Sequence, residues 1–257
     1  MNTNTIKVSG SIVIYHENKD TLQRVIKNFL AMQYEKELVI IDNSTNDTLR
    51  IFCESFKSVK YIFVGKNIGF GSAHNLGFSE LSCKSDIHLV LNPDIYFESK
   101  EIEKFIKWLY EEKDISLAVP RVYFPDAKVQ NTIRNIPTVA TLLKRRLNIK
   151  GIFDEFIKKD EFDGVKFDGV CKIPFAHGCF FAMPSAVYEK LGGFDERYFM
   201  YMEDIDICIR AKSYGKTVIH GDFSIFHEYR KGSSKSLKLL WWHIVSAFKF
   251  FLKNKEK

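Results

Sequence analysis

Five short apolar runs recur at nearly regular intervals through the first 120 residues, and this rhythm constrains the fold more than any other feature. The runs are β-rich and five residues long: residues 11–15, 37–41, 60–64, 87–91 and 116–120. Between most of them lie segments with apolar residues at helical spacing, such as 22–30 and 102–109. Strands that alternate with helices of this length indicate βαβ units on a mostly parallel sheet. Helices cover both faces of such a sheet, which explains why its strands read as continuous apolar runs.

The rest of the chain departs from this rhythm. Residues 121–170 are loop-rich and locally charged. An apolar segment interrupted by His177-Gly178 follows at 173–184, and a late β-rich segment lies at 217–228. The chain has 257 residues, 46% of them hydrophobic, which is enough for a large core. Without an internal repeat or flexible linker, we expect one α/β domain over residues 1–234. Its first half would be residues 1–120, its mixed second half residues 121–234, and a C-terminal helix would span 235–257.

Charge and cysteine usage narrow the class of protein. Residues 228–257 carry eight Lys or Arg and two Asp or Glu, so the whole net charge of +6 lies there. A nucleic-acid binder more often spreads basic residues over its main fold, so we expect no nucleic-acid partner. The five cysteines are scattered without a C-x-x-C pair, which predicts reduced thiols in a cytoplasmic protein. The polar start lacks the apolar core of a signal peptide, and no uncharged apolar run reaches the ~18 residues of a membrane span.

Polar residues follow the predicted strands where each strand ends. The second strand is followed by Asp42, and the fourth by Asn92, Pro93 and Asp94. Ligands of parallel sheets gather at the carboxyl ends of the strands, which favours a binding role for these acids and amides. For Asn92-Pro93-Asp94 an ordinary turn is the alternative, because such residue pairs are common in turns.

The segment "KNIGFGSAHNLGF" at 66–78 is a glycine-rich turn that opens a helix. It lacks the third glycine of the dinucleotide-binding fingerprint and follows the third strand, which disfavours a nicotinamide-dependent oxidoreductase. No Gly-Lys-Ser/Thr follows, so it is not a phosphate-binding P-loop either. Such a turn can bring backbone close to a ligand, with Asn67, His74 and Asn75 available for hydrogen bonds. The alternative is a plain helix start.

The segment "FMYMEDIDICIR" at 199–210 places two acids after four aromatic or Met residues. Glu203 and Asp204 would lie at a helix N-terminus, where the dipole favours carboxylates. The helix would have Ile205 and Ile209 on its apolar face and Arg210 pointing outward. A carboxylate against apolar surface has a raised pKa and can act as a general base.

A histidine, His227, ends the last β-rich segment. A single histidine in this position is more often structural than a metal ligand. Together with Asp94, however, it offers one nitrogen and one oxygen ligand. This set suits a divalent ion that also binds phosphate oxygens.

These motifs, in this order, resemble the family 2 glycosyltransferases, whose GT-A fold binds nucleotide sugars. The resemblance covers nearly the whole chain. It includes "SIVIYHEN", "VIIDNS", the N-x-G-F-x-x-x-x-N-x-G pattern in 66–78, "LNPD" as a variant of the D-x-D metal motif, and "GGFDERYFMYMEDIDICIR". It implies an inverting transferase with a Rossmann-like central sheet. Asn92 stands where the family's first Asp would be, which leaves fewer direct metal ligands.

The resemblance also implies residue roles. Asp94 and His227 would hold Mg²⁺ or Mn²⁺ against the donor diphosphate. Asp204 would be the catalytic base, and Glu203 would orient the acceptor, with the two roles exchangeable; Gly178 would also contact the acceptor. The implied donor-binding residues are Tyr15, Asp42, Asn67, Gly71, Asn75 and Asn92.

A narrower resemblance points to bacterial rhamnosyltransferases of cell-surface polysaccharide synthesis. It rests on "FGSAHN", "FMYMEDIDIC" and "WWHIVSAFKFF". These enzymes add L-rhamnose to N-acetylglucosamine carried on a polyprenyl diphosphate, which implies dTDP-L-rhamnose as the donor. A UDP-hexose donor remains an alternative, and so does a glycan-binding protein that kept the fold without activity.

The basic tail has helical periodicity. Its apolar residues form one face: Leu237, Leu240, Trp241, Ile244, Val245, Phe248, Phe251 and Leu252. Lys238, Lys249 and Lys253 lie off this face, and Lys255 and Lys257 follow. The pattern is that of a helix lying in a membrane interface, so we expect peripheral association with the inner, anionic face of the membrane. The alternative is a helix packed on the protein's own core.

Overall fold

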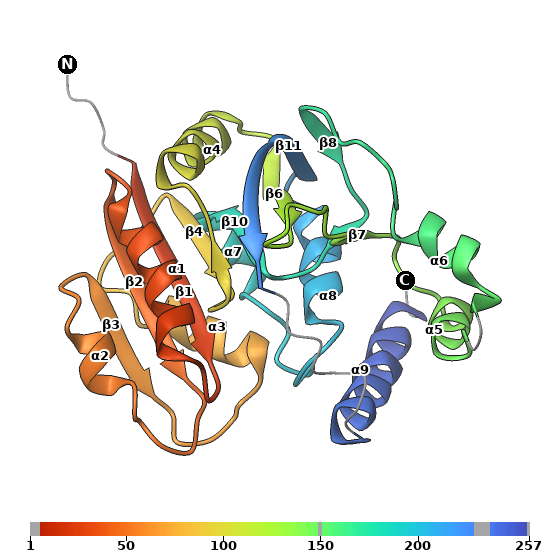
Figure 1. The fold of residues 1–257 in the computed structure, drawn as a ribbon, viewed down its shortest axis with the longest axis horizontal. Coiled ribbons are helices and arrows are strands. Elements are labelled where there is room, and N and C mark those ends of the chain that lie inside the picture. Colours follow the sequence, from red (N-terminus) through yellow and green to blue (C-terminus); the bar gives the residue numbers. More distant parts are fainter. Residues whose placement is uncertain (1–5, 149–150, 229–236, 256–257) are drawn as a thin grey trace.

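The computed structural model describes residues 6–148, 151–228 and 237–255 (Figure 1). All five predicted strands are present. The elements of the first half are β1 (Lys7–Ile14), α1 (Lys19–Ala31), β2 (Glu35–Asp42), α2 (Arg50–Glu54), β3 (Val59–Phe63), α3 (Phe70–Ser79), β4 (Ile87–Leu91), β5 (Ile95–Tyr96), α4 (Ser99–Glu111) and β6 (Ile115–Tyr123). The turn at 66–78 does open a helix, α3.

The second half mixes short strands and helices, as its broken rhythm predicts. Its elements are β7 (Ile133–Arg134), α5 (Val139–Arg146), α6 (Asp154–Asp160), β8 (Val170–Lys172), β9 (Phe175–Ala176), β10 (Phe180–Pro184), α7 (Ser185–Leu191), α8 (Glu203–Ala211), β11 (Lys216–His227) and α9 (Leu237–Lys255). The predicted C-terminal helix is α9. The outermost residues of that prediction, 235–236 and 256–257, lie outside the described part of the chain.

One sheet runs through both halves, in the order β3-β2-β1-β4-β10-β6-β11-β5, with β8 paired to β11. Strands β3, β2, β1 and β4 are parallel neighbours. Strand β10 enters antiparallel between β4 and β6, and its first residue, Phe180, pairs with Leu91 at the carboxyl end of β4. This pairing brings residues 177–179 to the edge of the sheet where the first-half strands end.

Helices cover both faces of the sheet (Figure 1). The predicted apolar faces of α1 and α4 are buried on one side, together with alternate residues of the strands, such as Leu38 and Leu89. Helices α3, α7 and α8 pack on the other side, where Val90 and Val39 point. The alternation of side chains along each strand explains how the apolar runs serve two cores at once.

Candidate active site

Asp94 and His227 lie side by side at the carboxyl edge of the sheet. Strand β5 pairs with β11 so that Ile95 faces His227, and the Glu228 N–H donates to the Asp94 carbonyl at 2.9 Å. These contacts bring His227 Nε2 to 3.1 Å from Asp94 Oδ1. The sequence predicted this pair, and the return of β11 along β5 is what assembles it.

The surroundings of His227 fix the orientation of its ring. Gln130 Oε1 accepts a hydrogen bond from His227 Nδ1 at 2.9 Å, which leaves Nε2 facing Asp94 and, at 3.5 Å, the amide of Asn92. Burial lowers the pKa of His227, but its contacts with Asp94 and Cys179 outweigh burial and raise the pKa to about 10. A divalent ion bound at Nε2 would therefore displace a proton from the ring. Neither Gln130 nor Cys179 was predicted, and the "HGCF" sequence alone gives no signal for such a contact.

The donor set fits a divalent ion. Asp94 Oδ1 is buried and has no partner of good hydrogen-bond geometry, although Nε2 is near. Two ligands of an octahedral ion, each ~2.1 Å from it, lie about 3 Å apart, which matches this separation. Among the described residues no group of three or more His, Cys, Asp or Glu side chains could hold an ion. Asp94 and His227 would therefore need further oxygen ligands from a bound molecule.

Glu203 and Asp204, the acid pair, begin helix α8 as predicted. Glu203 is 7% exposed, and its Oε2 has no hydrogen-bond partner, whereas Asp204 Oδ1 accepts from the Ile205 N–H at 2.8 Å. Burial and then the neighbouring charge of Asp204 raise the pKa of Glu203. Burial also raises the pKa of Asp204, opposed by backbone hydrogen bonds and the charge of Arg134. Both carboxyl groups are therefore stronger bases than ordinary ones.

The backbone before the acid pair is strained. Tyr201 and Met202 have φ values of 68° and 69°, in the left-handed region that side chains disfavour. Two such residues in succession persist only where the surroundings impose them, and they cluster at functional sites. Residues 193–202 are called the 193–202 loop below. The contacts of this loop with the rest of the protein hold Tyr201 and Met202 at their positive φ values.

Residues 178 and 179 connect the histidine side of the site with the acid side. A Cβ placed on Gly178 would lie 3.5 Å from the Asp204 Cβ, so the glycine backbone lies directly beside this acid. The next residue, Cys179, accepts a hydrogen bond from the Asn92 N–H at 2.9 Å. The segment before β10 thus places Asp204 and the Asn92–Asp94 turn at one edge of the sheet.

The predicted nucleoside side lies after β1 and β2. Tyr15 is 52% exposed. Asp42 is buried, and its carboxylate accepts from Tyr61 Oη at 2.6 Å and from the Ser44 N–H at 2.8 Å. The Ser44 hydroxyl in turn accepts from the His16 N–H at 2.8 Å. Asp42 therefore orders this pair of loops, and its contact with a nucleoside stays a prediction.

The glycine-rich turn is docked against the 193–202 loop. Asn67 Oδ1 accepts from the Gly69 N–H at 2.9 Å, and the Phe70 N–H donates to the Phe199 carbonyl at 3.3 Å. Gly69 has a φ of 90°, and a Cβ there would lie only 2.4 Å from the Phe199 oxygen. The turn needs glycine here for close approach to protein backbone, whereas the sequence suggested a ligand.

The structure gives Gly71 and Asn75 a different role from the predicted donor contact. The Asn75 amide donates to the Phe194 carbonyl and Glu196, and it accepts from the Phe194 N–H and Tyr188 Oη, all within 3.0 Å. These four bonds use its whole hydrogen-bonding capacity. A Cβ on Gly71 would lie 2.8 Å from the Phe194 Cβ. Both residues hold the 193–202 loop against α3.

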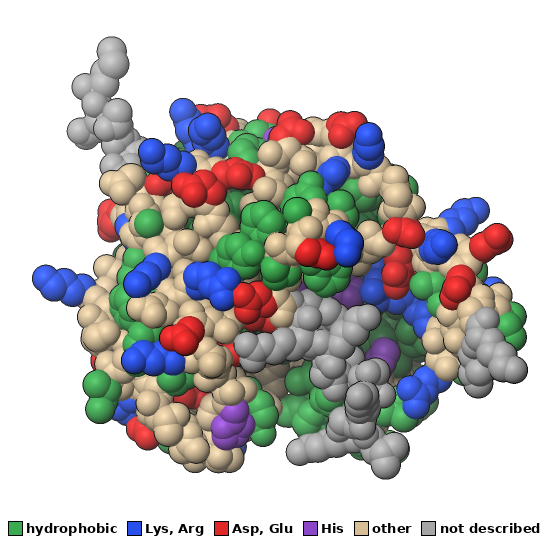
Figure 2. All heavy atoms as spheres, in the orientation of Figure 1, with side chains coloured by type: hydrophobic (Ala, Val, Ile, Leu, Met, Phe, Trp, Pro, Cys, Tyr) green, Lys and Arg blue, Asp and Glu red, His purple; other side chains and the backbone are tan. Residues whose placement is uncertain are grey.

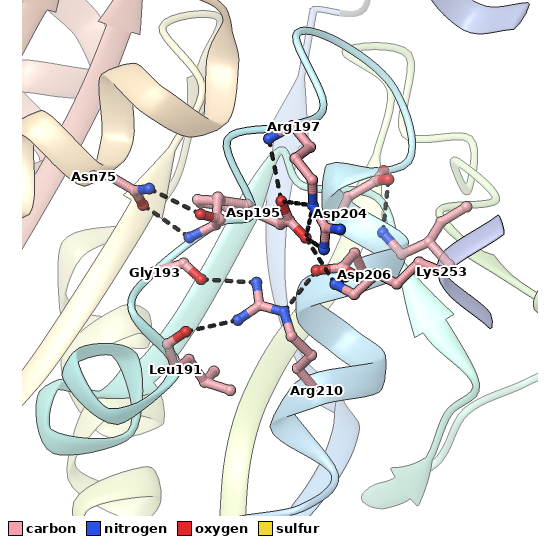
Figure 3. A network of polar contacts seen from close by, with 11 residues as sticks. Asn75, Leu191, Gly193, Asp195, Arg197, Asp204, Asp206, Arg210 and Lys253 are labelled. Carbon is pink, nitrogen blue, oxygen red and sulfur yellow. Dashed lines mark hydrogen bonds and ion pairs between the residues drawn. The ribbon is translucent and has the colours of Figure 1, made fainter. Parts of the chain in front are cut away.

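A charged network fixes the other side of this loop (Figure 3). Arg210 donates from Nε to Asp206 Oδ2 at 2.6 Å and from its other nitrogens to the carbonyls of Leu191 and Gly193. Lys253 from α9 donates to Asp195 Oδ2 at 2.7 Å and also to Asp206 Oδ1. The expectation that Arg210 points outward is wrong, because backbone carbonyls and a buried acid hold it inward.

One face of α9 follows the 193–202 loop along its length. Ser246 donates to the Met200 carbonyl at 2.8 Å, and Lys249 donates to the Arg197 carbonyl at 2.7 Å. The Trp242 ring lies 4.4 Å from the ring of Phe199, between centroids. Together with Lys253 these side chains recur at i, i+4, i+7 and i+11, the spacing of one helical face. This spacing could have been read from the sequence, but the prediction considered only the apolar face of the tail.

A hollow of about 460 Å³ lies at the opposite, amino end of the sheet. Its lining includes Lys7, Glu35, Glu37 and Lys60. Parallel sheets bind ligands at the carboxyl ends of their strands, and the acids there already pair with lysines, as Glu35 does with Lys7 at 2.9 Å. We do not assign the site to this hollow.

Comparisons with known proteins agree with this arrangement. Residues 11–192 match the family described as Glycosyl transferase family 2. The Rhamnosyltransferase WbbL of Escherichia coli (strain K12) is 25% identical over 256 residues, 95% of this chain and 92% of the relative. The N-acetylglucosaminyl-diphospho-decaprenol L-rhamnosyltransferase of Mycobacterium tuberculosis (strain ATCC 25618 / H37Rv) is 23% identical over 72% of this chain, which spans 64% of that relative.

Solved structures show the same fold. GalNAc-T7 with UDP, GalNAc and Mn²⁺ matches 96% of this chain with a TM-score of 0.68 and 16% identity, over 49% of its own length. The mannosyltransferase PcManGT from Pyrobaculum calidifontis, with GDP-Man and Mn²⁺, matches 96% of this chain with a TM-score of 0.63 and 14% identity, over 65% of its own length. The predicted GT-A fold is thus confirmed. With the family match over most of its length, the chain belongs to the family 2 glycosyltransferases.

Proposed function

We propose that this glycosyltransferase transfers L-rhamnose from dTDP-L-rhamnose to a GlcNAc-type sugar carried on a polyprenyl diphosphate, with inversion at the anomeric carbon. The observation that carries the chemistry is the acid pair, with Glu203 buried and Asp204 partly buried beside Gly178, at the sheet edge that also holds Asp94 and His227. Similarity to two proteins named as rhamnosyltransferases supports the donor sugar, and the decaprenol-linked substrate in one of those names supports the acceptor class.

Asp204 acts as the base in this proposal. An acceptor hydroxyl attacks the anomeric carbon while its proton moves to the Asp204 carboxylate, and the bond from that carbon to the diphosphate oxygen breaks. The nucleoside diphosphate leaves with the bonding electrons. The raised pKa of Asp204 suits this task, because a base is most effective when its pKa approaches the working pH.

Glu203 orients the acceptor. Burial and the adjacent charge favour its protonated form, which can donate a hydrogen bond to a sugar oxygen as well as accept one. Its Oε2 has no partner within the described structure and is therefore available for this contact. The same features would let Glu203 exchange roles with Asp204, so the two acids need separate tests.

Asp94 and His227 would hold Mg²⁺ or Mn²⁺ together with the donor phosphates, with Asn92 beside them. The ion supplies positive charge that stabilises the departing diphosphate. Mn²⁺ in the structures of GalNAc-T7 and PcManGT supports a divalent ion at a GT-A site. Within the part of the chain that the structure describes, no group of three or more His, Cys, Asp or Glu side chains could hold an ion, so metal affinity depends on the donor.

A lipid-linked acceptor implies that the enzyme acts at a membrane surface. The sugar end of a polyprenyl diphosphate projects from a bilayer, so the enzyme must reach that surface. We place the protein in the cytoplasm, peripherally associated with the inner face of the membrane. The rhamnosyltransferase relatives support this location through the lipid carrier in the name of one of them.

A donor screen tests the proposed function. Purified full-length protein is given dTDP-L-rhamnose, UDP-glucose or UDP-GlcNAc with a synthetic GlcNAc-diphosphate-lipid acceptor and Mg²⁺ or Mn²⁺. We expect transfer only from dTDP-L-rhamnose, and none in the Asp204→Asn variant. Transfer from a UDP sugar alone would favour the second candidate, a UDP-hexose transferase, which the UDP in GalNAc-T7 supports. Donor binding without hydrolysis or transfer would indicate a binding protein.

A further inference from the structure

The face of α9 turned away from the 193–202 loop is apolar and exposed. Trp241, Ile244, Phe248 and Leu252 are 64%, 53%, 65% and 49% exposed, and they recur at i, i+3, i+7 and i+11. Four large apolar side chains in one row are more than the isolated exposed residues of an ordinary surface. Helix α9 is thus two-sided. Its inner face binds the loop before the acid pair, and its outer face meets the surroundings.

Helix α5, together with Leu147 directly after its last residue, carries a second exposed apolar row. Val139, Leu143 and Leu147 are 55%, 55% and 56% exposed and recur at i, i+4 and i+8. Helices α5 and α9 lie next to each other in Figure 1, and the same region of Figure 2 shows apolar side chains together with basic and acidic ones. Burial, followed by the charges of Arg145 and Arg146, lowers the pKa of His243 on α9, which supports their proximity.

Basic side chains lie near the two rows. Lys144, Arg145 and Arg146 occupy the last turn of α5, and Arg145 pairs with Asp160 and Glu161. Helix α9 contains four Lys and no Asp or Glu, and one of the four, Lys253, pairs with Asp195 and Asp206. Each basic residue near an anionic bilayer adds attraction, and apolar side chains between basic ones are typical of helices that lie in the interface. No helix in the described ranges is long and apolar enough to cross a membrane.

We propose that the outer faces of α5 and α9 form one docking surface for an anionic phospholipid bilayer, and that α9 thereby holds the acid pair beside the bilayer. The proposal rests on the proposed function, since it assigns a position to the lipid-linked acceptor. The inner face of α9 contacts the 193–202 loop, which directly precedes Glu203, and a helix is ~10 Å across. A sugar joined through a diphosphate to a membrane lipid would therefore emerge close to Asp204.

Vesicle co-sedimentation tests the docking surface without donor or acceptor. Full-length protein is mixed with phosphatidylcholine/phosphatidylglycerol vesicles at low salt. We expect sedimentation of the wild type, weakened by high salt, and at least ~10-fold weaker binding for a Trp241→Glu, Phe248→Glu double variant. Leu143→Glu on α5 should also weaken binding. Ile51→Glu is the matched control, because Ile51 is 85% exposed on α2 yet belongs to neither row. Circular dichroism and urea denaturation check that each variant is folded.

Several results would overturn the proposal. Wild-type protein could remain in the supernatant at low salt, or the double variant could sediment as well as the Ile51→Glu control. Light scattering without vesicles could show a dimer that Trp241→Glu and Phe248→Glu dissociate, in which case a second copy covers the rows.

Turnover with a short-chain, water-soluble acceptor separates this proposal from the proposed function. We expect the variants with weakened vesicle binding to keep wild-type turnover with that acceptor. With acceptor embedded in vesicles, the same variants should lose turnover. Equal loss with both acceptors would show that the variants damage the enzyme itself and would count against the docking surface. Vesicle binding by a wild type that transfers no sugar would refute the proposed function and leave the docking surface standing.

Discussion

Replacing Lys253 with Met removes one charge from the network that joins α9 to the 193–202 loop. Lys253 is 17% exposed and bonds to Asp195 and to the buried Asp206. A hydrogen bond to a charged group is worth ~1.5–3 kcal/mol, so two could contribute ~3–6 kcal/mol. Both acids keep an arginine, however: Arg197 at 2.6 Å from Asp195, and Arg210 at 2.6 Å from Asp206. An arginine still pairs with each carboxylate, so we expect a loss of about 3 kcal/mol, at the low end of that sum.

Urea denaturation of both proteins measures this loss in the free energy of unfolding, with the slope compared to check that the unfolded states match. Lys249→Met is the control, because Lys249 is exposed and donates only to a backbone carbonyl, so it should cost less than about 1 kcal/mol. Donor affinity should be unchanged in Lys253→Met, while turnover falls because the loop before the acid pair loses its support. A Lys253→Met loss no larger than that of Lys249→Met would refute the tethering role of the network.

Four further variants test the site. Asp94→Ala should abolish metal-dependent dTDP binding in calorimetry with little change in unfolding, and unchanged binding would make Asp94 a turn residue only. Asp204→Asn should bind donor normally and lose ~10²–10⁴ in turnover, whereas near-normal turnover would pass the role to Glu203. The pKa of Glu203 is raised on folding, so wild-type stability declines as pH rises from about 4. Glu203→Gln lacks this decline, so its urea midpoint should exceed that of the wild type increasingly from pH 4 to pH 8, and a difference independent of pH would argue against the raised pKa. Gly69→Ala should destabilise the protein by ~1–3 kcal/mol, because its new Cβ would meet the Phe199 carbonyl at a positive φ.

Local sequence patterns predicted the elements well, because burial imposes the period of each element on its own residues. The run 87–91 is strand β4, and the acids at 203–204 begin α8. The placement of β10 between β4 and β6 could not be read from the sequence, because strand pairing depends on how distant segments return. The site shows the same contrast between local patterns and long-range pairing. Asp94 and His227 were predicted from their chemistry and the family resemblance, whereas the pairing of β5 with β11 that brings them together was not.

Side-chain partners were the least predictable part of the site. Asn75 looked like a ligand contact because amides at a glycine-rich turn often bind ligands, yet its partners come from a loop more than a hundred residues away. Arg210 looked solvent-exposed because helical period alone assigned it outward, whereas carbonyls from the end of α7 bind it. Lys253 appeared to be one of many tail charges. Periodicity predicts the helical face on which a side chain lies, but not the distant group that contacts that side chain.

The strained backbone at Tyr201 and Met202 has a consequence for biosynthesis. The contacts that stabilise it come partly from α9, and chains emerge from the ribosome N-terminus first, at ~5–20 residues per second. About fifty residues separate Glu203 from Lys253, so synthesis of the support follows that of the acid pair by roughly 3–10 seconds. The first-half strands can pair during this interval, while the acid pair reaches its final geometry only afterwards. A nascent chain is therefore expected to gain the ability to bind donor before it gains the ability to turn it over.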